Sequence, residues 1–73
     1  MKEFDKAVDA YNRGIAVDEL DERLYQRLML CYKQMGLKSE AIKVYNQCKT
    51  ILFHSLRIEP SPETQNIYKS LLL

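Results

Sequence analysis

Cysteine, histidine, glycine and proline are scarce in this sequence, and tryptophan is absent. Its two glycines, Gly14 and Gly36, lie far apart, so no glycine-rich loop is available to bind phosphate groups. Cys31, Cys48 and His54 are the only soft metal ligands, and a structural zinc site needs four ligands, typically in closely spaced pairs. We therefore expect no nucleotide-binding loop, no metal site and no cofactor.

An excess of charge and long apolar runs are missing as well. The formal net charge of the 73 residues is +1, which gives no strong attraction to DNA, RNA or an acidic membrane. No apolar run is long enough to span a bilayer, and no charged segment followed by an apolar one opens the chain as a signal peptide would. We therefore expect reduced cysteines, a cytoplasmic location and no contact with membranes.

What the sequence does contain is apolar residues at the helical period. In residues 3–17, Phe4, Ala7, Val8, Tyr11 and Ile15 follow the spacing of one helix face. Residues 21–35, 38–56 and 61–72 show the same period, and no segment alternates as a strand would. The pattern predicts one small all-α domain of about four helices. The tyrosines on these stripes, which we expect in the core, are Tyr11, Tyr32, Tyr45 and Tyr68.

The expected helix boundaries have physical causes. Asp21 can accept hydrogen bonds from the free N–H groups of a first helical turn, and Gly36 can adopt the left-handed conformation that ends a helix. Pro60 disfavours helix at the residue before it. Ser61 is a good N-cap, and Pro62 stands at the first helical position, where its missing N–H costs nothing. The two prolines therefore predict a tight corner between two helices.

Two segments resemble each other at a spacing of 34 residues, since EFDKAVDAYNRG aligns with LKSEAIKVYNQC. The aligned pairs are Ala7 and Ala41, Tyr11 and Tyr45, and Gly14 and Cys48. This spacing is the period of the tetratricopeptide repeat, a helical hairpin that stacks on its neighbours. The resemblance implies a right-handed stack of hairpins, with a half repeat at 3–17, a full repeat at 21–56 and a closing helix at 61–73. The proline that often ends a repeat is absent, so we expect the third helix to be longer than usual.

The half repeat has an apolar face without a partner helix. Solenoids usually need about three repeats to be stable, so we interpret the chain as a segment of a longer protein. We also expect exposed apolar surface near Phe4 and Val8, and self-association through the face of helix 3–17.

A narrower resemblance covers about residues 20–72. Residues 22–29 resemble an E-L-x-R-x-L-M helix, residues 36–42 a G-x-x-x-E-A-L turn, and residues 56–64 an L-G-V-E-P-S-P-E-T close. Together these motifs resemble the bacterial transcriptional activator domain, the tetratricopeptide-like module of SARP-type regulators. Arg57 stands where that family usually has glycine. Because arginine tolerates a left-handed cap poorly, we expect the helix to end differently there.

The resemblance implies a regulatory module that contacts other proteins and has no catalytic activity. Its partner would be RNA polymerase or other domains of the parent regulator, and DNA would be read by a separate domain, with no direct nucleic-acid contact from this segment. The alternative is a general tetratricopeptide-repeat scaffold segment with no role in transcription.

The resemblance also implies where a partner would bind. In the repeat family the first helix of a hairpin lines the inner groove. The corresponding residues, which we expect to form the partner-binding face, are Arg23, Gln26, Leu30 and Lys33.

An enzyme has little support in the sequence. Cys48 and His54 are six residues apart, on different sides of one helix, so they would not meet as a nucleophile and its base. The carboxylates Asp18, Asp21 and Glu22 cluster, but a loop and a helix cap explain them better than acid–base catalysis does.

Overall fold

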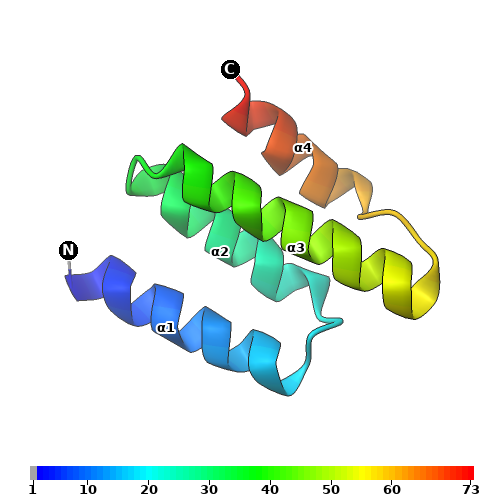
Figure 1. The fold of residues 1–73 in the computed structure, drawn as a ribbon. Coiled ribbons are helices and arrows are strands. Elements are labelled where there is room, and N and C mark those ends of the chain that lie inside the picture. The colour runs from blue at the N-terminus through cyan, green and yellow to red at the C-terminus, as the bar shows by residue number, and fades with distance from the viewer. Residues whose placement is uncertain (1) are drawn as a thin grey trace.

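The computed structural model describes residues 2–73, which form four helices and no strand. The helices are α1 (Lys2–Val17), α2 (Glu22–Gln34), α3 (Lys38–Leu56) and α4 (Pro62–Leu71). Consecutive helices run antiparallel and are joined by short turns (Figure 1). The predicted all-α fold of helical hairpins is confirmed. None of the described helices has the length and hydropathy needed to cross a bilayer.

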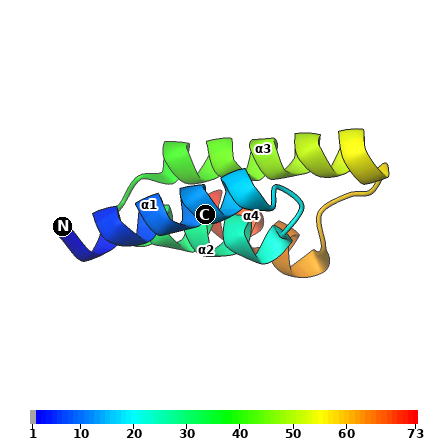
Figure 2. The same ribbon diagram turned by 90° about the horizontal axis from the view of Figure 1, so that it is seen from below.

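The helix α2 is the centre of the arrangement. It packs against α1, α3 and α4, and α4 also contacts α3. Figure 1 shows α2 between α1 and α4, and Figure 2 shows α3 along one side of the molecule. Every contact between described helices therefore involves α2, except the contact between α3 and α4.

The predicted caps are present. The Asp21 carboxylate accepts a hydrogen bond from the backbone nitrogen of Arg23 at 3.1 Å, as an N-cap does. Gly36 follows α2 with a φ of 77°, a conformation that costs glycine little. Ser61 is the N-cap of α4, and Pro62 occupies its first position.

The C-terminus of α3 differs from the expectation. Arg57 adopts the left-handed conformation itself, with φ 57° and ψ 37°, and its N–H donates to the carbonyl of Phe53 at 3.0 Å. This is the usual left-handed helix cap, so the expectation of a different end was wrong. The guanidinium carbon of Arg57 lies 5.0 Å from the centre of the Phe53 ring, a cation–π contact that offsets part of the backbone strain.

The core is formed by the apolar faces of all four helices. Tyr45 and Tyr68 stack with ring centres 4.0 Å apart, which joins α3 to α4. Gly14 on α1 permits close packing of α2, because a Cβ there would lie 2.9 Å from Leu24 Cδ1. The buried cluster comprises Ile15, Tyr25, Leu28, Met29, Ala41, Val44, Tyr45, Cys48, Leu52 and Leu71, and the tyrosines Tyr11, Tyr32 and Tyr68 pack against it.

Some apolar residues of the predicted stripes lie outside this core. Leu56, the last residue of α3, is 50% exposed, and Leu72, which directly follows α4, is 59% exposed. Phe4 and Val8 on α1 are half-buried, and Val8 packs against the core. The most exposed large apolar side chain within a helix is instead Val17, at the end of α1.

Candidate functional site

Two of the four residues expected to bind a partner form hydrogen bonds to another helix of the chain. Gln26 donates through Nε2 to the hydroxyl of Thr64 at 2.8 Å, and Lys33 donates through Nζ to the hydroxyl of Ser70 at 3.0 Å. Both acceptors belong to α4, so these two side chains connect α2 to α4. Arg23 and Leu30 are exposed, as is Lys33, but neither Arg23 nor Leu30 forms a side-chain hydrogen bond to α4.

The open face of α2 is formed by a slightly different set of residues. Arg27 and Gln34 are exposed together with Arg23 and Leu30. Their spacing of i, i+4, i+7 and i+11 places all four on one stripe of the helix. We call Arg23, Arg27, Leu30 and Gln34 the α2 ridge. Sequence reasoning missed Arg27 and Gln34, although the helical spacing from Arg23 would have pointed to both.

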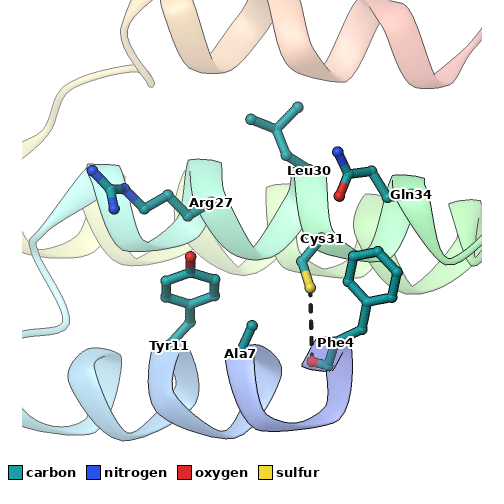
Figure 3. Close-up of a pocket in the computed structure, with 7 residues that line it drawn as sticks. All are labelled: Phe4, Ala7, Tyr11, Arg27, Leu30, Cys31 and Gln34. Atoms are coloured by element: carbon teal, nitrogen blue, oxygen red, sulfur yellow. Dashed lines mark hydrogen bonds between the residues drawn. The ribbon is translucent and has the colours of Figure 1, made fainter. Parts of the chain in front are cut away.

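A groove of about 230 Å³ lies beside the ridge, between α1 and α2. Its lining residues are Phe4, Ala7 and Tyr11 from α1 and Arg27, Leu30, Cys31 and Gln34 from α2 (Figure 3). We call this hollow the α1–α2 groove.

The lining of the groove is largely apolar, with polar groups toward its ends. The thiol of Cys31 is directed at α1, where its Sγ donates to the carbonyl of Phe4 at 3.8 Å (Figure 3). Tyr11 and Arg27 lie toward one end, and Phe4 and Gln34 toward the other (Figure 3). Within residues 2–73, Arg27 takes part in none of the ion pairs, which join Arg13 to Asp9, Arg23 to Asp21 and Lys43 to Glu40. A helix or peptide with an apolar stripe and a carboxylate would complement this lining.

The nucleophile-type side chains are placed for packing. Cys48 is fully buried, and burial raises the pKa of its thiol to about 12, so it is protonated at neutral pH. Burial, followed by the charge of Asp5, also raises the pKa of Cys31. His54 is exposed on α3. Among residues 2–73, no three histidine, cysteine or carboxylate side chains come together in a way that could hold a metal ion.

One carboxylate has a role that the sequence did not reveal. Glu22 Oε2 accepts hydrogen bonds from the backbone nitrogen and the hydroxyl of Ser61, each at 2.7 Å, and from the hydroxyl of Thr64. Burial alone would raise the pKa of Glu22, but these hydrogen bonds outweigh it and the net pKa is lowered. Glu22, Gln26, Ser61 and Thr64 form what we call the Glu22 junction. This junction joins the start of α4 to the first half of α2.

Comparison with known proteins agrees with this architecture. The family model described as bacterial transcriptional activator domain matches residues 1–72, which extends the resemblance to the first helix. The chain is 31% identical over 68 residues to the transcriptional regulatory protein MoaR1 of Mycobacterium bovis (strain BCG / Pasteur 1173P2) and to MoaR1 of Mycobacterium tuberculosis (strain ATCC 25618 / H37Rv). The match covers 93% of this chain but 22% of each relative, so the chain spans about a fifth of their length. No solved structure gives a significant match. With nearly its whole length covered by the family model, the chain belongs to the bacterial transcriptional activator domain family.

Proposed function

We propose that this chain is a protein–protein interaction module of a bacterial transcriptional regulator and has no catalytic activity of its own. The observation that supports it best is the α2 ridge beside the α1–α2 groove, an open apolar and cationic surface on a chain of this family. Such a surface supplies binding energy through burial and charge pairing, and it contains no activated nucleophile.

The partner-binding residues of this proposal are revised by the contacts on α2. Arg23 and Leu30 remain candidates because both are exposed and, unlike Gln26 and Lys33, are not bonded to α4, and Arg27 and Gln34 join them on the ridge. The partner would be RNA polymerase or other domains of the same regulator. The proposal places this work in the cytoplasm, with DNA contacted by other parts of the regulator.

The test is a charge substitution on the ridge of the regulator as its gene encodes it. Leu30→Asp should reproduce the transcript changes of a gene deletion, measured by RNA sequencing, because a buried carboxylate in an apolar contact is strongly unfavourable. Asn46→Asp adds the same charge on the exposed side of α3 and should behave like the wild type. Thermal unfolding should show that both variants are folded. A Leu30→Asp strain with wild-type transcript levels would argue against the ridge as the contact surface.

A further inference from the structure

Exposed apolar side chains gather at one end of the molecule. Because consecutive helices run antiparallel, the α1–α2 turn and the α3–α4 corner lie at the same end (Figure 1, Figure 2). Within residues 2–73, nine large apolar side chains are exposed, and five of them belong to this end. These five are Val17 and Leu20 at the α1–α2 turn and Phe53, Leu56 and Ile58 at the α3–α4 corner. We call residues 17–20 and 49–58 together the turn end.

The two parts of the turn end carry opposite charges. Asp18 and Glu19 stand between the two apolar residues of the α1–α2 turn. In the other part, Lys49 and Arg57 lie four residues to either side of Phe53, which places all three on one stripe of α3 and its cap. Within residues 2–73, none of these four charged side chains takes part in an ion pair. Both signs of charge are therefore available to a partner, each beside exposed apolar surface.

One of these charges is held in place at a cost to the fold. Arg57 has a φ of 57°, a left-handed conformation in which arginine is strained and glycine is not. Its guanidinium lies over the exposed ring of Phe53, and Glu59, the acidic residue nearest to it in the sequence, forms no ion pair with it. Strained residues cluster at sites that bind or react, where function rather than stability retains them. The strain at Arg57 therefore marks this end of α3 as a contact surface.

From these observations we infer that the turn end binds a second copy of this chain. The acidic α1–α2 turn of one copy lies on the cationic end of α3 in the other, and the same contact is repeated in the reverse sense. Such a two-fold pair closes on itself, because each copy presents the same two complementary parts side by side. Burial of the exposed apolar side chains supplies the free energy, and the charges determine which part faces which. The inference goes beyond the proposed function, since it concerns a surface other than the α2 ridge.

The mixed charge of the turn end favours a second copy over other partners. A nucleic acid or an acidic protein segment would be attracted by Lys49 and Arg57 but repelled by Asp18 and Glu19. A second copy offers both signs in a complementary arrangement. It also covers the apolar residues of both parts at once.

The position of this surface differs from the one expected from the sequence. The sequence predicted self-association through the face of helix 3–17, near Phe4 and Val8. Both of these side chains are half-buried, whereas Val17, the last residue of α1, is 90% exposed. The apolar surface available on this helix therefore lies at its end, next to the acidic turn.

The experiment is site-specific photo-crosslinking in the regulator as its gene encodes it. The photoreactive residue p-benzoylphenylalanine replaces Leu56 at the turn end or, as a control, the exposed Leu37 in the α2–α3 turn at the opposite end. A denaturing gel separates joined copies from single chains, and mass spectrometry maps the joined peptides. We expect position 56 to join two copies through residues 17–20 of the second, and position 37 not to do so. The same substitution at Ile58 should give the same peptides.

Charge exchange tests the pairing. Glu19→Arg and Arg57→Glu should each lower the yield of joined copies several-fold, because each places like charges opposite one another. The double variant should recover most of the yield, since the attraction is restored with the signs exchanged. A double variant that yields no more than the weaker single variant would overturn the pairing of the two parts.

A glycine variant separates binding from folding. Arg57→Gly relieves the backbone strain, so the fold should be at least as stable as the wild type in thermal unfolding. The same variant lacks the cation and should lower the yield of joined copies several-fold. An unchanged yield would show that Arg57 serves the fold alone.

The remaining outcomes are equally decisive. Cross-links from position 56 that stay within one chain, or that reach another protein or another part of the second copy, would overturn the inference. The absence of cross-links from a folded protein would overturn it as well. None of these results bears on the α2 ridge, which the transcript levels of Leu30→Asp test separately.

Discussion

The carboxylate of Glu22 lies 2.7 Å from both the backbone nitrogen and the hydroxyl oxygen of Ser61, a residue 39 positions further along the chain. Ser61 is also the N-cap of α4, so one side chain of α2 holds the residue that starts another helix. Hydrogen bonds to a charged acceptor are roughly twice as strong as neutral ones. The packing of α4 on α2 therefore depends on the ionised form of Glu22.

Replacing Glu22 by glutamine should destabilise the fold. The amide keeps the shape but loses the charge, so we expect the free energy of unfolding to fall by about 1–3 kcal/mol. Urea denaturation followed by circular dichroism measures this change. Glu19→Gln is a matched control, because the Glu19 side chain is exposed, and it should change stability by less than about 0.5 kcal/mol. Equal effects of the two variants would contradict a role for the junction.

The junction should also make stability depend on pH. The pKa of Glu22 is lowered in the folded protein, so its contribution is complete above the unfolded pKa, near the ordinary value of 4.5. That contribution is lost as the pH falls through the folded pKa. Between about pH 5 and pH 3 the wild type should therefore lose more stability than Glu22→Gln does. Parallel curves for the two proteins, measured by urea denaturation, would show that Glu22 is not the responsible group.

The left-handed conformation of Arg57 predicts an unusual order of stabilities. Glycine should relieve about 1 kcal/mol of backbone strain but lose the contact with Phe53, which is worth about 0.5 kcal/mol at an exposed site. Alanine loses the contact and keeps the strain. We expect the free energy of unfolding to decrease in the order Arg57→Gly, wild type, Arg57→Ala. If the glycine variant were no more stable than the alanine variant, strain at this residue would be negligible.

The stack of Tyr45 on Tyr68 predicts a difference between two substitutions of Tyr68. Alanine removes the ring and leaves a gap between α3 and α4, so it should cost about 2–3 kcal/mol of stability. Phenylalanine keeps the ring and should cost less than about 0.5 kcal/mol. Thermal or urea unfolding distinguishes the two. A large loss for Tyr68→Phe would instead assign the stabilisation to the hydroxyl group.

Local signals in the sequence were sufficient for the helices and most of their ends. Asp21, Gly36, Ser61 and Pro62 act through backbone groups within a few residues of themselves, so their roles can be derived from short segments. The conformation of Arg57 was predicted wrongly because that prediction, too, used only a local signal, the residue type. Its side chain disfavours the left-handed conformation, but the hydrogen bond to the Phe53 carbonyl and the ring beneath its guanidinium favour it.

The partner-binding surface on α2 was harder to predict, because it depends on which helices lie side by side. Helical spacing places Gln26 and Lys33 near Leu30 on α2, but only the position of α4 shows that they bond to Thr64 and Ser70. The role of Glu22 likewise depends on its contact with Ser61, 39 residues further along the chain, and no local pattern in the sequence indicates that contact.

The attachment of α4 is uneven along its length, and this has a mechanical consequence. Its first turn is held by the several hydrogen bonds of the Glu22 junction, whereas its last turn is held by the buried side chain of Leu71, the bond of Ser70 to Lys33 and the longer contact of Lys38 with the Leu73 carbonyl. A pulling force applied at Leu73 would act on the contacts of the last turn first and would separate α4 from the rest of the fold beginning at its C-terminal end. The junction would yield last, so tension at Leu73 would expose the end of α2 that carries Lys33 before the end that carries Glu22.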